Sequence, residues 1–168
     1  MTPPLLRAGA PRPLRLTLAA AAVSLALTGC TSSGYPADPD GTLDSVSGGT
    51  LRAGVSHHPP YVDARGAEPT GSEAELIRSF AAAHEAEVEW TVSTEESLMT
   101  ALEKGDLDLV AGGLTTSSPW TSHAALTRGY TEVTGPDGEP VELAMAVPLG
   151  ENQMLGALEA HLDQEGQR

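Results

Sequence analysis

The sequence lacks most of the features on which enzyme sites depend. Cys30 is the only cysteine among its 168 residues, so no disulfide can form within the chain. A Gly-x-Ser-x-Gly elbow, a His-Glu-x-x-His pair and a phosphate-binding loop are all absent. One close carboxylate pair, Asp106 and Asp108, flanks a short predicted strand and is more typical of solvated strand ends than of acid–base catalysis. We therefore expect neither catalysis nor a cofactor.

Basic side chains are also scarce. Nine Lys and Arg residues stand against 23 Asp and Glu residues, which gives a net charge of −14. All the acidic residues follow Cys30, whereas some of the arginines precede it, so the later part of the chain is the more acidic one. Such a domain repels nucleic acid and anionic lipid, and it suits a polar compartment and cationic partners. We therefore expect no nucleic-acid binding.

No apolar run reaches the ~20 residues that a membrane-spanning helix needs. The longest run, over 16–27, follows arginines and ends in small residues, which predicts a secretory signal over 1–29. The tetrapeptide Leu27-Thr28-Gly29-Cys30 resembles a lipobox, in which the cysteine thiol receives a diacylglyceryl group. The resemblance implies a lipid anchor at Cys30 on the extracytoplasmic face of the cell membrane. An unmodified cysteine beside an ordinary cleavage site is the alternative.

The composition changes near residue 50. Residues 30–49 are rich in Ser, Gly, Pro, Asp and Thr and contain few apolar residues. Because such a segment cannot offset the entropy of ordering, we predict a flexible tether over 30–49. The folded domain is expected over 50–165.

The expected domain alternates strand patterns with helix patterns. Apolar alternation or short apolar runs predict strands over 51–55, 87–92 and 107–110. Helical spacing predicts helices over 72–84, 94–104 and 149–162, and Ser72 and Thr94 can cap the first two. This order predicts an α/β fold with a mainly parallel sheet flanked by helices.

Two polar loops follow strands of this sheet and are expected to meet at its carboxyl edge, where ligands bind in such folds. One contains Pro59-Pro60-Tyr61, and the other covers residues 112–120. Rings, hydroxyls and backbone N–H groups on these loops are candidate ligand contacts: Tyr61, Gly113, Thr115, Ser117 and Trp120. Each has an ordinary alternative, namely loop packing for Tyr61, turn formation for the Ser/Thr/Gly residues and core packing for Trp120.

Adjacent histidines, His57 and His58, could bind a metal together with His123 or Glu73. Neighbouring side chains of a strand point apart, and no HxH or HxxxH spacing supports the site. We therefore expect no metal.

Three motifs together carry a family resemblance. The run Leu51–Ser56, the Pro59-Pro60-Tyr61 and Thr70-Gly71 segments, and the run Leu102–Thr115 occur in order, and together they resemble the first lobe of family 3 extracellular solute-binding proteins, the polar amino-acid receptors of ABC importers. The resemblance covers about residues 50–130, with a weaker echo over 145–162. It implies a single lobe of a type II periplasmic-binding-protein-like fold. It also implies a small polar solute such as an amino acid, and a membrane transporter, as partners.

The sequence departs from this family where the second lobe should be inserted. Only Thr131–Glu139 lies between the segment matching Leu126–Tyr130 and the next predicted strand, Val141–Val147. The turn residues Gly135-Pro136-Asp137-Gly138 predict a direct link between the two segments, for which a hairpin is one form. We therefore expect a truncated, single-lobe relative.

Two ligand contacts of the family are also replaced. The family's arginine clamp for the ligand carboxylate corresponds to Trp120, and its Phe-Asp pair corresponds to Ser72-Glu73, which makes Glu73 a further candidate contact. Because one lobe provides only one wall of a cleft, we expect weak binding by a monomer. Two hypotheses follow: weak solute capture for a transporter, or a protein-interaction or sensory lipoprotein whose partner supplies the second wall.

Overall fold

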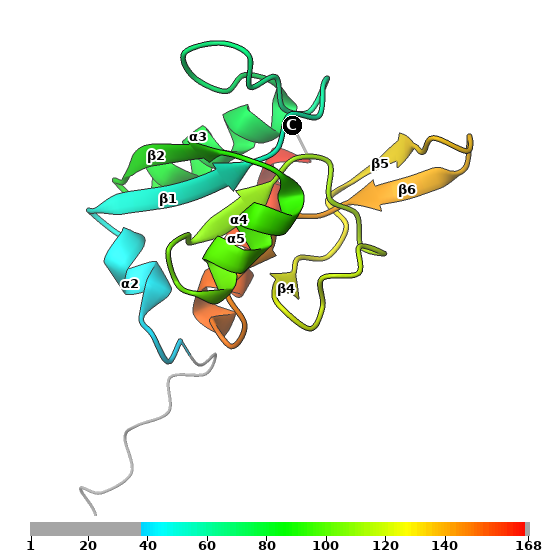
Figure 1. Ribbon diagram of the computed structural model, residues 1–168. Coiled ribbons are helices and arrows are strands. Elements are labelled where there is room, and N and C mark those ends of the chain that lie inside the picture. The colour runs from blue at the N-terminus through cyan, green and yellow to red at the C-terminus, as the bar shows by residue number, and fades with distance from the viewer. Residues whose placement is uncertain (1–37, 167–168) are drawn as a thin grey trace, which may run out of the picture. The chain divides into compact units, whose positions relative to one another are not determined.

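A five-stranded sheet forms the centre of the protein. The computed structural model describes residues 38–166. The strand order is β2 (Glu87–Val92), β1 (Thr50–Val55), β3 (Leu109–Ala111), β7 (Ala146–Val147) and β4 (Ala125–Leu126). Strand β1 pairs in parallel with both β2 and β3, whereas β7 is antiparallel to β3 and β4 (Figure 1). The predicted α/β fold with its parallel strands is therefore confirmed.

Helices cover both faces of this sheet. Helices α3 (Ser72–Ala83) and α5 (Asn152–Glu165) pack on one face, and α4 (Glu95–Glu103) packs on the other. Strand β3 serves both faces, because Leu109 and Ala111 join the core under α3 and α5 while Val110 joins the core under α4. Thr94 caps α4 as predicted, since its side chain accepts from Ser97 N. The predicted cap of α3 is wrong, because Ser72 is helical and Gly71 precedes the helix without a side-chain cap.

The predicted tether is wrong for residues 38–49, which belong to the folded body. They contain helix α2 (Thr42–Val46), whose Val46 is fully buried. The carboxylate of Glu151 accepts from the backbone N of Asp40 and of Thr42, each at 3.0 Å. A buried side chain and a partner 109 residues away order a segment whose composition alone would leave it mobile. Cys30 and the predicted signal lie outside the described residues.

Asp108 also differs from expectation. Its side chain is buried and forms an ion pair with Arg52, whose backbone N donates to the same carboxylate at 2.8 Å. The carboxylate therefore fixes the start of β3 against β1 and is not a solvated strand end.

The predicted hairpin is present. Strand β5 (Thr131–Thr134) pairs antiparallel with β6 (Pro140–Leu143), and the ribbon extends away from the five-stranded sheet (Figure 1). Its turn is closed by Gly135 N donating to Glu139 O at 2.7 Å, and Gly138 adopts a φ of 87°. Within the range 38–166, no helix has the length and apolar character required to cross a bilayer.

Candidate functional site

The loops after β1 and β3 are fixed to each other at the carboxyl edge of the sheet. Ser56 N donates to Ala111 O at 3.1 Å, and Ser56 Oγ donates to Gly112 O at 3.0 Å. Gly112 has a φ of 136°, and a Cβ there would lie 2.8 Å from Ser56 N. The close approach of the two loops therefore requires glycine at this position.

A pocket of about 410 Å³ lies between these loops and the hairpin. We call it the rim pocket. The loops contribute His58, Pro59, Pro60, Tyr61, Gly113 and Thr115. The hairpin contributes Val133, Thr134, Gly135, Pro136, Val141 and Leu143. Three predicted site residues, Tyr61, Gly113 and Thr115, are thus brought together, and the hairpin stands opposite them as a second wall.

Tyr61 and Thr115 contribute polar side chains to this pocket, as do His58 and Thr134. The ring of Tyr61 is stacked with that of His58, with centroids 5.7 Å apart and an interplanar angle of 16°. Thr115 Oγ1 lies 3.0 Å from Ser117 Oγ, and Thr115 N donates to Ser118 Oγ. Ser117 does not line the rim pocket, and its hydroxyl contacts a residue that does, Thr115.

Glu73 lies behind the wall of the pocket and does not line it. It is fully buried, and its carboxylate accepts from Gly113 N and from the Tyr130 hydroxyl, each at 2.8 Å. Its own backbone N donates to Tyr61 O at 3.0 Å. Burial raises the pKa of Glu73, although the hydrogen bonds from Gly113 and Tyr130 oppose that effect. Glu73 is therefore a positioning residue and not a surface that a ligand could touch.

The same hydrogen bond changes the expected role of Gly113. Gly113 lines the pocket, but its N–H already donates to Glu73. Among the described residues, none of the side chains that line the rim pocket belongs to lysine or arginine. An anionic group of a ligand would therefore meet few donors in this pocket.

Trp120 lies elsewhere. It packs against the core under α4, and its Nε1 donates to a carboxylate oxygen of Glu95. Its ring also contacts His123 edge-on, at a centroid distance of 6.0 Å. Of the two roles considered for Trp120, the structure supports packing, because Trp120 is not among the residues that line the rim pocket.

Sequence reasoning missed the contribution of the hairpin and of Tyr130. The four turn residues after β5 predicted that the chain reverses, but they did not indicate which surface the returning strands would face. The signal that could have identified Tyr130 is its position at the base of the predicted hairpin, directly before β5. Burial and the adjacent Glu73 raise the pKa of its hydroxyl, so it remains a neutral donor.

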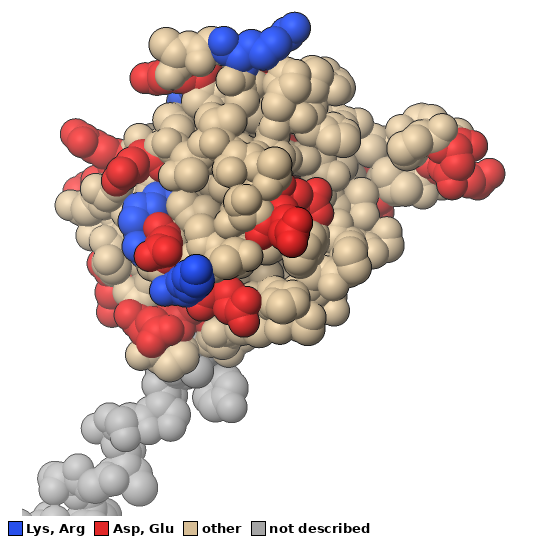
Figure 2. Space-filling view, viewed as in Figure 1, with Lys and Arg blue, Asp and Glu red and all other residues tan. Residues whose placement is uncertain are grey.

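The surface around the site is acidic. Figure 2 shows acidic side chains gathered at the end of the hairpin, where Asp137 and Glu139 are exposed. Several described arginines are already engaged with acidic partners: Arg52 with Asp108, Arg65 with Asp63, and Arg128 with Glu159. The resulting field favours the approach of cationic solutes.

Residues 51–158 match the family of bacterial extracellular solute-binding proteins, family 3. The chain is 34% identical over 131 residues to YhdW of Escherichia coli (strain K12), which is provisionally named an amino-acid ABC transporter-binding protein. The match covers 73% of this chain and 35% of YhdW, so the chain spans about a third of that relative's length.

Solved structures share the fold. Domain 1 of TmArgBP in its arginine-bound form has a TM-score of 0.63 and 20% identity, with 72% of this chain and 97% of that chain covered. An ancestral cationic amino acid solute binding protein has a TM-score of 0.65 and 14% identity, covering 75% of this chain and 94% of that chain. Arginine-bound truncated ArgBP from T. maritima has a TM-score of 0.63 and 12% identity, covering 73% of this chain and 99% of that chain.

Proposed function

Since the chain belongs to the bacterial extracellular solute-binding proteins, family 3, we propose that it captures a small polar solute for an amino-acid ABC transporter. Within this proposal the chain is held at the extracytoplasmic face of the cell membrane through a lipid on Cys30. The name of YhdW supports the transporter class. The acidic composition is compatible with this location, because an anionic lipid surface repels the domain and leaves it exposed to the solvent.

The observation that carries the proposal is the two-sided rim pocket. Tyr61 and Thr115 face it from the lobe, and Val133 and Val141 face it from the hairpin. The hairpin stands where the family inserts its second lobe, so it offers a partial replacement for the missing wall. The volume of the rim pocket, about 410 Å³, lies within the ~300–1,000 Å³ range of small-molecule sites.

The charges around the pocket favour a cationic amino acid. The α-carboxylate that all amino acids share finds no lysine or arginine among the described lining residues, and the N–H of Gly113 is occupied, so the choice between amino acids falls to the ligand side chain, where a second carboxylate would also lack a partner. A cationic side chain, in contrast, meets the Tyr61 ring in the pocket, and the exposed carboxylates of Asp137 and Glu139 on the hairpin turn favour its approach. The solved arginine-bound form of domain 1 from TmArgBP supports the view that one lobe can hold such a ligand.

A ligand panel tests this proposal. We expect arginine or lysine to raise the melting temperature of the full-length chain, and glutamate at the same concentration to leave it unchanged. Tyr61→Ala and Thr115→Val should weaken binding measured by calorimetry. Thr100→Val, which removes an exposed hydroxyl on α4, is the matched control. If no amino acid stabilises the protein at millimolar concentration, the proposal is wrong.

A second function, binding of a partner protein, is favoured by the hairpin itself. Strands β5 and β6 form a sheet of their own, and the outer edge of β6 bridges to Thr115 at Leu143, so among the described residues it is β5 that keeps an edge without a strand partner. Such an edge, with the acidic turn, could dock a basic segment of a membrane protein. A photo-crosslinker at position 137 should then capture one membrane protein in cells, and Glu139→Lys should abolish the crosslink. Crosslinking that is unaffected by this charge reversal would exclude this function.

A further inference from the structure

The two adjacent histidines after β1 have different surroundings. The Nδ1 of His57 accepts from Ala64 N at 3.2 Å and lies 3.6 Å from Asp63 Oδ1, and His57 does not line the rim pocket. His58, in contrast, lines the rim pocket. Only the second histidine therefore reaches the site proposed for the solute.

The imidazole of His58 is held in the wall of the pocket. Its backbone N donates to Val62 O at 2.8 Å, and its ring stacks on that of Tyr61. The ring also covers Gly113, because a Cβ there would lie 2.6 Å from His58 Cδ2 and 2.9 Å from His58 Nε2. The ring is therefore positioned by contacts on two sides before a ligand arrives.

The ring nitrogens of His58 remain available. Within residues 38–166, neither of them has a hydrogen-bond partner. Among the described residues that line the rim pocket, His58 alone has a side chain that can carry a positive charge. An imidazole ordinarily changes charge between about pH 5 and pH 8, and both of its nitrogens donate in the charged form. The pocket therefore gains a cationic donor when this one side chain is protonated.

The other charged groups near His58 are negative. The buried carboxylate of Glu73 lies behind Gly113, whose N donates to it at 2.8 Å. Burial raises the pKa of Glu73, and attraction to His58 is one of the smaller effects that oppose this rise. On the hairpin, the lining residues carry no charge, and Asp137 and Glu139 are exposed at the turn. A ligand carboxylate therefore meets only like charges unless His58 is protonated.

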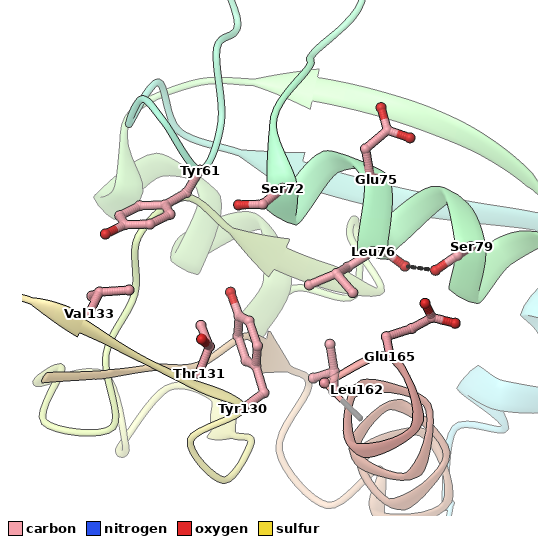
Figure 3. A pocket seen from close by; sticks show the side chains of 11 residues that line it. Tyr61, Ser72, Glu75, Leu76, Ser79, Tyr130, Thr131, Val133, Leu162 and Glu165 are labelled. Atoms are coloured by element: carbon pink, nitrogen blue, oxygen red, sulfur yellow. Dashed lines mark hydrogen bonds between the residues drawn. The ribbon is translucent and has the colours of Figure 1, made fainter. Parts of the chain in front are cut away.

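We propose that protonated His58 binds the α-carboxylate of the solute, so that capture is tighter in acidic surroundings. The carboxylate lies between the imidazolium and the hydroxyl of Thr115, which also lines the pocket. The solute side chain extends along the Tyr61 ring to the hairpin. Figure 3, which looks into an adjoining cavity, shows Tyr61 beside Val133, and both residues line the rim pocket as well. This assignment rests on the solute-binding function proposed above and adds a control by pH to it.

Calorimetry on the full-length chain at about pH 5.5 and at about pH 8 tests the assignment. We expect arginine to bind about fivefold more tightly at the lower pH, because a charge-assisted hydrogen bond is then added. Agmatine, which is arginine without its carboxylate, should show no such gain. A change in the protonation of Glu73 would affect both ligands, so the comparison separates the carboxylate contact from a general effect of pH.

Two glutamine variants locate the effect at one ring. His58→Gln should lose the gain for arginine at the lower pH and bind about as tightly as the wild type at the higher pH, because glutamine stays neutral. His57→Gln is the matched control and should retain the gain. Its side chain does not line the pocket, and the amide oxygen of glutamine can still accept from Ala64 N.

The outcomes distinguish this assignment from the proposed function. Arginine affinity that is equal at the two pH values would overturn the assignment and leave the proposed function intact. A gain that survives in His58→Gln, or that agmatine shares, would do the same. Arginine that binds at neither pH would overturn the proposed function and the assignment with it. The agmatine comparison uses the wild type, so its result does not depend on how the variants fold.

Discussion

The central sheet and the β5–β6 hairpin are built in opposite ways. All three residues of β3 are buried, whereas three of the four residues of β5 are exposed. The sheet is covered on both faces by helices, while the hairpin is attached mainly at its base, where Tyr130 N donates to Leu143 O at 3.1 Å. Isolated two-stranded ribbons are marginally stable in water. The comparison indicates that the sheet supplies the stability of the protein, and the hairpin supplies a wall of its site.

Truncation of Phe80 should give the largest loss of stability. Its ring is fully buried and projects from α3 toward α5, with its centroid 4.4 Å from that of His84 and 5.6 Å from that of His161. We expect Phe80→Ala to lower the free energy of unfolding by about 3–5 kcal/mol, because it removes apolar contacts and leaves a cavity. Urea denaturation measures this loss. If any hairpin substitution lowered the free energy of unfolding more than Phe80→Ala does, the sheet would not be the main source of stability.

Removal of the Glu73 carboxylate should have the next largest effect. Glu73→Ala leaves Gly113 N and the Tyr130 hydroxyl without their acceptor, which should cost about 2–4 kcal/mol because each unpaired buried donor is destabilising. Glu73→Gln retains the shape of the side chain and an amide oxygen that can accept from Gly113 N. The glutamine variant should therefore be the more stable of the two by urea denaturation.

The glutamine variant also reveals the pH dependence that Glu73 creates. Burial raises the pKa of Glu73 above its ordinary value of 4.5, so the folded protein holds this proton more tightly than the unfolded chain does. The resulting stabilisation is complete below pH 4.5 and is lost as the pH rises through the raised pKa. The stability of the wild type relative to Glu73→Gln should thus fall as the pH increases. A difference that stays constant with pH would contradict the burial of the charge.

A pair of glycine substitutions separates backbone conformation from close packing. Gly112 and Gly138 both have positive φ, of 136° and 87°, but a Cβ would meet Ser56 backbone atoms at Gly112 and nothing within 4 Å at Gly138. Gly138→Ala should cost about 1–2 kcal/mol from conformation alone. Gly112→Ala should cost about 1–3 kcal/mol more, because the rim loops must move apart. Equal losses in thermal unfolding would mean that the two loops separate easily.

The sequence predicted those parts of the fold whose signals are local. The strand at Leu51, the helix capped by Thr94 and the reversal at Gly135–Gly138 each depend on residues close together in the chain, and each is present. Helix α2 was missed because its first N–H, that of Thr42, donates to Glu151, more than 100 residues later. Long-range partners of this kind leave no local pattern.

The candidate site was predicted in part for the same reason. Tyr61, Gly113 and Thr115 lie together because parallel strands end at one edge of a sheet, which follows from the strand pattern. That Glu73 occupies the N–H of Gly113, and that Trp120 bonds to Glu95, depend on side-chain packing in three dimensions. Residue type and spacing therefore located the rim, but they did not determine which of its groups remain available to a ligand.

The smallest change in stability should come from the hairpin wall, where the largest change in function is expected. Val133 is half-buried, pairs with Val141 across the hairpin and lines the rim pocket. Val133→Ala should cost about 1 kcal/mol or less, since little apolar surface returns to water. It should nevertheless weaken binding of the rim ligand severalfold in calorimetry, because the wall loses a contact. Val92→Ala, at a valine that is 51% exposed on β2, controls for the loss of two methyl groups. If Val133→Ala destabilises the protein strongly and leaves binding intact, the hairpin is a structural element and the site lies on the lobe alone.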